Sequence, residues 1–529
     1  MSRTVPTLLA ALAVCVAAAG CEKSAHGTAG SSGEPSIKVV STDRPAGLDP
    51  ATATDAGARA LLPNVYQTLL TIPPGETTPV PDAADCQFDT PTTYTCTMRS
   101  GLTFHNGHKL DAADVKYSID RLRTVPGAGR GAALFASVAS VEADEDTVTF
   151  NLRRPDATLP YALTTPAASI VDQEVYAADR PVEPAEAAGS GPYRVVRYAA
   201  KGALVLERFT GYKGVRPARN GTVEIGFPSA GATAGTTAGA AVVAAVEAGR
   251  ADLGIGAILP RAQAPATTST PAGTAPRLST LDGTLTGWWT FHLNAPAARY
   301  QVVRRAVAQL VDREALVRRV YGETATASYS LLPAGFEGHV DAFRDSYGVP
   351  DRAKAAALLR AAKLHVPVPV TIGWTARPGG TVAREVDEVR RQLQASGLFR
   401  VTVRQAPGPQ FAQRAASGAY DLFPVERDAE LPDGDGFVSP VLRPGGRPAY
   451  GYASVAAARL VEAERTGQSL ADRERAFGDL QRLLATDVPV LPVWQGRTAL
   501  LAASRLTGAD SALDRTSAVR FAYLGREGK

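Results

Sequence analysis

The chain has 529 residues and a formal net charge of +4 at pH 7, with its Lys and Arg residues spread along the sequence. This length suits two or three structural units. A weak, dispersed positive charge lacks the basic stripe of a nucleic-acid-binding protein. After the first twenty residues, no run is apolar enough to cross a membrane. The sequence has no nucleophile-elbow, zinc-protease or phosphate-loop motif, so it predicts neither an enzyme nor a cofactor.

The amino terminus predicts export. Leu8 to Ala19 is an unbroken apolar or small stretch, too short to span a bilayer and typical of a signal peptide. Ala18-Ala19-Gly20-Cys21 resembles a bacterial lipobox, so we expect a signal over residues 1–20 and lipid on Cys21. A plain secretory signal with an unmodified Cys21 is the alternative. Residues 21–35 are mostly small and polar, which predicts a flexible tether.

The remaining cysteines predict a disulfide. Cys86 and Cys96 flank a segment with hairpin character, whose turn falls at residues 89–92. Two cysteines in facing strands of an exported protein favour a bridge. A metal site would need more ligands than this pair offers, and we predict no metal.

Short β-branched strands alternate with Ala-, Arg- and Leu-rich helices, which predicts an α/β protein. In chain order we expect strands or strand clusters at 37–41, 86–98, 138–142, 147–152, 193–198, 204–208 and 286–294. We expect helices at 61–70, 301–321, 351–363, 381–396 and 469–486. In the second of these helices, apolar residues share one face, and we expect Arg304, Arg305, Arg313 and Arg318 on a solvated face.

Residues 100–118 combine three local signals. Leu102 and Phe104 alternate with polar neighbours as in a strand, Asn106-Gly107 is a turn dipeptide, and Asp111 can cap a following helix. The stretch also resembles a signature of the family 5 solute-binding proteins of ABC importers. Other segments resemble further motifs of that family in the same order, among them Leu48-Asp49-Pro50, Gly189-Ser-Gly-Pro-Tyr193 and Val488-Pro-Val-Leu-Pro492.

The resemblance implies a two-lobed periplasmic-binding-protein type II (cluster C) fold with a hinge and an inserted subdomain. Lobe I would span 36–285, with the insert at about 70–183, and lobe II would span 286–492. Residues 493–529 would return to lobe I. The two crossings between lobes would lie at 286–294 and 492–498, with the ligand held between the lobes.

The resemblance also indicates candidate ligand-binding residues. Arg377-Pro378 is similar to a turn that holds a peptide carboxylate in dipeptide binders. Counting back from Phe437 places Glu430 at the family's amine-binding Asp and Arg427 at its Trp, and Asp433 also matches a family Asp. An ion pair between Arg427 and Glu430, or a solvated acidic loop, is the competing interpretation.

Trp288 and Trp289 are adjacent in an expected strand and therefore face opposite sides. One is expected in the core, and the other could stack on a ligand in the cleft. Burial of both in the core is the alternative.

These expectations combine into one functional hypothesis. The chain would be a lipid-anchored, extracytoplasmic substrate-binding subunit that captures a small peptide or peptide-like solute by hinge closure. Its partners would be an ABC permease and ATPase, and it would be a monomer. The alternatives are a binder of nickel chelates, oligosaccharides or signalling peptides, a sensor that kept the fold, and an exported hydrolase.

Overall fold

The computed structural model describes residues 36–199, 201–228, 237–257, 275–376, 381–429, 431–442, 450–467 and 469–526. In these ranges the chain forms an α/β protein around three large hydrophobic cores. One core joins residues 37–255 to residues 500–524, one uses residues 288–494, and one gathers mainly residues 51–170. We call the surrounding parts the first lobe, the second lobe and the insert. None of the described helices has the length and apolar character needed to cross a bilayer.

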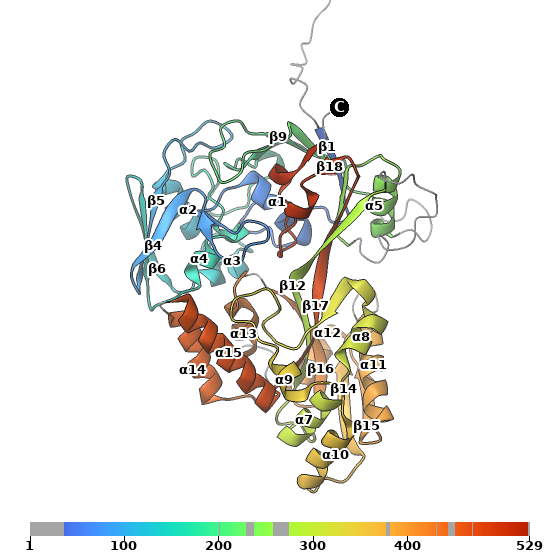
Figure 1. Ribbon diagram of the computed structural model, residues 1–529. Coiled ribbons are helices and arrows are strands. Elements are labelled where there is room, and N and C mark those ends of the chain that lie inside the picture. Colours follow the sequence, from blue (N-terminus) through green and yellow to red (C-terminus); the bar gives the residue numbers. More distant parts are fainter. Residues whose placement is uncertain are drawn as a thin grey trace, which may run out of the picture. The chain divides into compact units, whose positions relative to one another are not determined.

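The first lobe is built from both ends of the described chain (Figure 1). Its elements are β1 (Ser36–Ser41), α1 (Ala56–Val65), β8 (Tyr193–Tyr198), β9 (Leu204–Arg208), β10 (Thr222–Gly226), α5 (Ala238–Glu247), β11 (Leu253–Ile255), β18 (Leu506–Thr507) and β19 (Gly525–Arg526). Strand β1 runs parallel to β10 and β11, which flank it. A Cβ atom on Gly191 would lie 2.5 Å from the carbonyl carbon of Val65, so the close approach to the end of α1 requires glycine.

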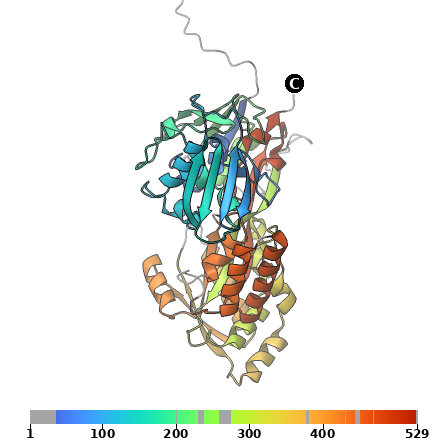
Figure 2. The same cartoon turned by 90° about the vertical axis from the view of Figure 1, so that its left-hand side faces the viewer.

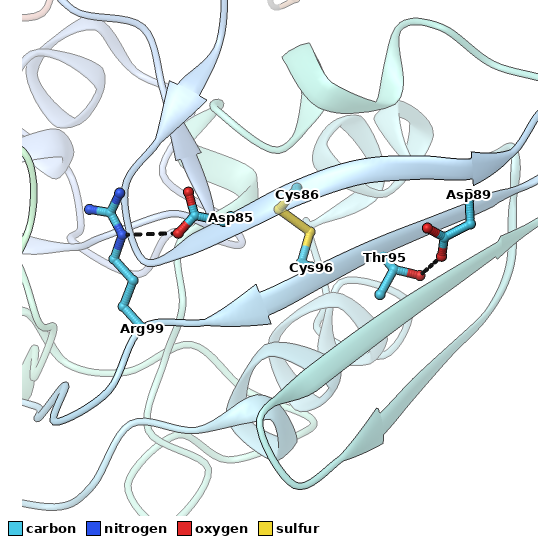
Figure 3. Close-up of a disulfide and its surroundings, with 6 residues drawn as sticks. All are labelled: Asp85, Cys86, Asp89, Thr95, Cys96 and Arg99. Atoms are coloured by element: carbon cyan, nitrogen blue, oxygen red, sulfur yellow. Dashed lines mark hydrogen bonds and ion pairs between the residues drawn. A yellow bond between two sulfur atoms is a disulfide. The ribbon is translucent and has the colours of Figure 1, made fainter.

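The insert is an antiparallel sheet with short helices. Its elements are β2 (Leu70–Thr71), β3 (Val80–Pro81), β4 (Ala84–Thr90), β5 (Thr93–Met98), α2 (Ala112–Arg121), α3 (Gly129–Leu134), β6 (Val138–Asp144), β7 (Thr147–Leu152) and α4 (Leu159–Ala162). Figure 2 shows the sheet in the order β4-β5-β7-β6. Cys86 and Cys96 are directly paired across β4 and β5 and form the predicted disulfide (Figure 3).

The second lobe alternates helices with strands. Its elements are α7 (Gln301–Leu310), α8 (Arg313–Val320), β13 (Ala325–Ala327), α9 (Ala342–Tyr347), α10 (Arg352–Ala361), β14 (Val368–Trp374), α11 (Thr381–Ala395), β15 (Phe399–Gln405), α12 (Gly408–Ala416), β16 (Leu422–Asp428), α13 (Asp435–Leu442), α14 (Val455–Thr466) and α15 (Leu470–Asp487). The insert sheet lies beside the α14–α15 pair in both views. Asp156 of the insert and Arg465 of α14 form an ion pair there at 2.7 Å.

Two long antiparallel strands, β12 (Arg277–Phe291) and β17 (Val490–Ala502), connect the lobes (Figure 1). The strand order β15-β14-β16-β12-β17-β11-β1-β10-β9-β8 therefore passes from one lobe to the other without a break. The pairing of β12 with β17 shifts register between Asp282 and Thr286 and again between Gly287 and Trp288. Such irregularities bend a strand and raise its local twist.

The helix predicted at 301–321 is two helices. The backbone of Val311 is extended, and the Asp312 side chain accepts a hydrogen bond from the Ala315 amide at 2.8 Å, which starts α8. The prediction that Arg304 and Arg313 lie on a solvated helix face was also wrong, because both residues are buried. Their guanidinium groups donate to main-chain carbonyls, including those of Val488 and Pro492.

Two further boundaries differ from prediction. The helix expected at 61–70 is α1, which begins at Ala56 because Asp55 accepts from the Ala58 amide. The strand expected around Leu102 and Phe104 is reduced to a single bridge between Thr103 and Lys109. The cap predicted on the following helix is confirmed, because the Asp111 side chain accepts from the Ala113 amide at 3.1 Å.

Candidate functional site

A cavity of about 1060 Å³ lies between the first and second lobes, against the two connecting strands. The first-lobe wall is formed from the segments 41–43, 56–60, 255–257 and 513–519, and the second-lobe wall from the segments 318–324 and 381–384 together with Glu426 and Asp428. Strands β12 and β17 contribute residues 283–285 and 494–499. We call this space the cleft. Clefts between domains are the usual place for small-molecule sites, so the cleft is the candidate binding site.

The walls of the cleft carry both signs of charge. Its charged lining residues are Asp43, Arg59, Arg318, Arg319, Glu323, Arg384, Glu426, Asp428 and Arg497. Some of these groups already pair within the protein, as Arg319 does with Glu388 and Arg497 with Glu323. The described walls still present both signs of charge to a ligand that has an amine and a carboxylate.

One ion pair spans the cleft. Arg59 of α1 donates to Asp428 of β16 at 2.8 Å, and both side chains are about one-third exposed. Thr284 of β12 also donates to Asp428, at 2.6 Å. One carboxylate thus contacts the first lobe, a connecting strand and the second lobe together.

Two aromatic side chains of the cleft are held in place by hydrogen bonds to the buried carboxyl group of Glu385. The rings of Tyr321 and Trp494 line the cleft and lie 4.7 Å apart between centroids. Behind them, Glu385 of α11 accepts hydrogen bonds from the Tyr321 hydroxyl at 2.5 Å, the Trp289 indole at 2.6 Å and the Trp494 indole at 3.3 Å. Burial raises the pKa of the Glu385 carboxyl to about 7. A Cβ atom on Gly287 would lie 2.0 Å from the Trp494 ring, so the indole packs directly on the β12 backbone.

Both predicted tryptophans lie in the core of the second lobe. Trp288 is 2% exposed, and its indole donates to the Thr290 hydroxyl at 3.1 Å. Trp289 is fully buried and bonds to Glu385. Neither side chain lines the cleft. Trp494, on the neighbouring strand β17, supplies the aromatic surface instead.

Asp433 lies in a buried charge network. Arg473 of α15 donates to both carboxylate oxygens of Asp433, at 2.8 and 2.9 Å, and reaches Glu464 at 3.4 Å. Burial raises the pKa of Asp433 and Glu464. The same region contains the Asp435–Arg465 pair at 2.6 Å. In this structure Asp433 therefore ties the segment before α13 to α15.

Of the remaining predicted ligand-binding residues, Arg427 is described by the structure and lies away from the cleft. The Arg427 side chain lines a second cavity, which also contains Arg130. Burial and the charge of Arg130 lower the pKa of Arg427. Arg377, Glu430 and the lipidation candidate Cys21 lie outside the described residues.

Several cleft residues were not singled out from the sequence. Glu426 and Asp428 line the cleft and belong to the stretch that resembles the family's acidic motif. The alternation of side chains along a strand could have identified these two residues, because it places positions 426 and 428 of β16 on one face and position 427 on the other. Arg59, Tyr321 and Trp494 carried no local signal of a site.

The motifs of residues 48–50 and 100–121 serve the fold. Arg121 of α2 donates to both oxygens of Asp49, at 2.9 and 2.6 Å, and both side chains are 2% exposed. His108 bonds to the buried Asp172 at 2.7 Å. These contacts attach the insert to the first lobe.

Comparison with known proteins agrees with this architecture. The family of bacterial extracellular solute-binding proteins, family 5 Middle, matches residues 78–448. The chain is 24% identical over 435 residues to Di/tripeptide-binding protein 2 of Pseudomonas aeruginosa (strain UCBPP-PA14), covering 77% of this chain and 79% of that protein.

Two solved structures show the same fold. HbpA2 from Haemophilus parasuis has a TM-score of 0.80 at 17% identity, covering 93% of this chain and 100% of that chain. The periplasmic binding protein DppA from Helicobacter pylori, in complex with peptide STSA, has a TM-score of 0.67 at 20% identity, covering 93% and 98%. The chain belongs to family 5 of the bacterial extracellular solute-binding proteins.

Proposed function

We propose that this protein is the extracytoplasmic substrate-binding subunit of an ABC importer and that its cargo is a small peptide or peptide-like solute. The observation that carries the proposal is the cleft, whose walls come from both lobes and from the strands that connect them. The curated relative at 24% identity is a di/tripeptide-binding protein, which supports the same cargo class.

The charge distribution of the cleft suits a zwitterion. A ligand enclosed between lobes loses water, and an unpaired buried charge is costly. Guanidinium groups and carboxylates on facing walls offset that cost for a peptide's two termini. The space of about 1060 Å³ leaves room for side chains and for water around them.

Binding would be coupled to a hinge motion. A ligand that contacts both lobes stabilises the arrangement in which both contacts are made. The register shifts between β12 and β17 lie beside the cleft, where the sheet can bend without losing its pairing elsewhere. A permease would then distinguish the loaded from the empty subunit by its shape, and no bond is made or broken in the cargo.

Two residues are proposed to hold the peptide termini, on the strength of the sequence motifs. Arg377 would pair with the carboxylate and Glu430 with the ammonium group. Asp433 and Trp289 would act indirectly: Asp433 through its pair with Arg473, and Trp289 through Glu385, which orients the cleft residues Tyr321 and Trp494.

The amino-terminal segment is proposed to place the protein at the outer face of the cell membrane. Residues 1–20 would be a signal peptide, Cys21 would carry lipid, and residues 21–35 would tether a monomeric binding protein close to its permease and ATPase. Mass spectrometry of the membrane-extracted protein should show an acylated Cys21. Cys21→Ser should release the protein from the membrane fraction.

Isothermal titration calorimetry tests the cargo. Di- and tripeptides should bind, whereas nickel–histidine and oligosaccharides should not. Arg377→Ala and Glu430→Gln should each weaken peptide binding about tenfold or more, because each leaves a charged terminus unpaired. Arg482→Gln, which changes an exposed pair on α15, should bind like the wild type.

The outcomes separate two failures. If no peptide binds to the wild-type protein, the proposed cargo is wrong. If peptides bind equally well to Arg377→Ala, Glu430→Gln and the wild type, the cargo stands and the assignment of these two residues is wrong.

A further inference from the structure

A smaller cavity, of about 70 Å³, lies where the first lobe, the insert and the second lobe meet. The first lobe contributes Pro63, the segment 514–516 and Arg520, the insert contributes the segments 72–73, 75–77 and 164–166, and the second lobe contributes Phe336, Ala429 and Pro432. Arg59, Thr284 and Asp428 line both this cavity and the cleft, so the two spaces adjoin at the Arg59–Asp428 pair. We call the smaller space the junction pocket. It has room for about five water molecules, which is close to the size of one aliphatic side chain.

The walls of the junction pocket are largely apolar. Ile72 and Phe336 line it together with four prolines, which are Pro63, Pro73, Pro166 and Pro432. Proline has no N–H group and a fixed φ, so these positions offer no main-chain donor and change shape little. Phe336 is buried, and its ring packs against that of Phe437 with centroids 4.9 Å apart. This part of the wall therefore suits an apolar group.

Five threonines add hydroxyl groups to the wall, but these donors are already used. Each hydroxyl donates to an acceptor within the protein at 2.6 to 3.4 Å, and the residues are Thr77, Thr164, Thr165, Thr284 and Thr516. A polar ligand group that enters the pocket would lose water and find few donors in exchange, which is costly.

The Arg59–Asp428 pair can move aside for a ligand. Both side chains are about one-third exposed, and ion pairs of that kind contribute little stability. Opening the pair does not leave Asp428 alone, because Thr284 donates to the same carboxylate at 2.6 Å. A side chain of a cargo that is bound in the cleft can therefore enter the junction pocket from its cleft end.

The other charged groups of the wall favour no charged ligand by themselves. Arg520 and Asp514 pair with each other at 3.4 Å, and Glu76 is exposed. Arg515 donates to a main-chain carbonyl of β12 at 3.4 Å, and its buried Nε has no hydrogen-bond partner among the described residues. A main-chain carbonyl of a bound peptide is an acceptor for that donor. Glu430, next in sequence to this wall, lies outside the described residues, so the experiment compares apolar with charged side chains directly.

Building on the proposed function, we propose that the junction pocket receives one apolar side chain of the cargo, of about the size of leucine. The protein then selects small peptides that contain an aliphatic residue. Binding is favourable because apolar surface of that side chain leaves water. Since all three parts and β12 form the walls, an occupied pocket also favours the arrangement in which they meet.

Isothermal titration calorimetry of the purified protein tests this selection with Ala-Ala, Leu-Ala and Ala-Leu. At least one leucine peptide should bind about tenfold more tightly than Ala-Ala, because its larger side chain buries more apolar surface. Replacing that leucine with asparagine, which has nearly the same shape, should remove the advantage. Lysine or glutamate at the same position should also remove it.

Two variants with opposite effects on the pocket test the location. Thr164→Leu fills part of the space, so the leucine advantage should fall to less than about threefold while the affinity for Ala-Ala stays unchanged. Ile72→Ala enlarges the space, so the corresponding phenylalanine peptide should bind about tenfold more tightly than it does to the wild type. Thr149→Leu is the matched control on β7, outside the pocket wall, and should bind every peptide as the wild type does.

The outcomes separate this proposal from the proposed function. If the wild type binds Ala-Ala and both leucine peptides equally well, or prefers the asparagine, lysine or glutamate counterpart, the junction pocket is not an apolar subsite and the peptide cargo stands. The same conclusion follows if the leucine advantage is unchanged in Thr164→Leu and the affinity for the phenylalanine peptide is unchanged in Ile72→Ala. If no peptide binds to the wild type, the proposed function fails and the subsite fails with it.

Discussion

At the scale of single residues, buried polar groups hold in place the side chains that line the cleft. Glu385 does not line the cleft, yet it fixes three aromatic side chains, two of which do. Arg121 and Asp49 likewise fix the insert against the first lobe from a fully buried position. A buried pair is costly to break, because removing one partner leaves the other charge unpaired. Short motifs that look functional in the sequence can therefore be structural devices.

Glu385 gives a pH-dependent prediction. Its pKa is about 7 in the folded protein against an ordinary value of 4.5, so the folded state holds a proton that the unfolded state has lost at intermediate pH. Stability should therefore fall as pH rises from about 4.5 to 7, by up to about 3 kcal/mol from this group. Glu385→Gln should remove this part of the pH dependence, measured as the difference between wild-type and variant urea melts.

Other groups, such as Asp114, also titrate in this range, so only the difference between the two proteins reports on Glu385. A wild-type-minus-variant stability that stays constant across this pH range would contradict the prediction. Asp387→Asn, on the exposed face of the same helix, is the matched control and should leave the pH profile unchanged.

At the scale of elements, the β4–β5 hairpin shows how a local constraint stabilises the insert. Figure 3 shows the disulfide between neighbouring strands, with the Thr95–Asp89 and Arg99–Asp85 contacts on either side. Most of β4 is exposed or half-buried, so it contributes little to the insert core. The bridge compensates by restricting the unfolded hairpin.

Replacing both Cys86 and Cys96 with alanine should lower the free energy of unfolding by about 2–3 kcal/mol, the value expected for closing a loop of about ten residues. Urea melts of the double variant measure this loss. Cargo affinity should change little, because neither cysteine lines the cleft. Equal stability of the wild type with and without reductant would show that the bridge contributes nothing.

At the scale of the whole molecule, one sheet runs through both lobes, and the lobes also meet through side chains. The Arg59–Asp428 pair crosses the cleft, and Asp156–Arg465 joins the insert to α14. The first pair is partly exposed and is worth less than about 1 kcal/mol. A contact of the strength of the Arg59–Asp428 pair can favour an arrangement of the lobes without preventing a bound ligand from changing it.

Small-angle scattering tests whether ligand binding changes the arrangement of the lobes. Saturating peptide should reduce the radius of gyration of the wild type, because a ligand that contacts both walls draws them together. The Arg377→Ala/Glu430→Gln double variant should not contract at the same peptide concentration. Identical scattering curves for the empty and loaded wild type, with binding verified by calorimetry, would exclude hinge closure.

Local sequence signals predicted part of the elements. The Asp111 side chain caps a helix where expected, and the β8–β9 hairpin has the predicted bounds. Capping and alternation depend on neighbours a few residues away, so they are visible in the sequence. The predicted exposure of Arg304 and Arg313 was wrong because their hydrogen-bond partners are not local. These partners are main-chain carbonyls of β17 and of the segment before it, more than 170 residues away in the sequence.

The sequence by itself determined the family, the α/β class and the disulfide. Tertiary structure alone decided which side chains face the cleft. Positions 426 and 428 reach it while 427 does not, and Trp494 replaces the adjacent pair Trp288 and Trp289 as the aromatic surface. The physical reason is that burial and charge pairing depend on the neighbours that distant strands and helices supply, whereas caps, turns and strand periods depend on the local chain.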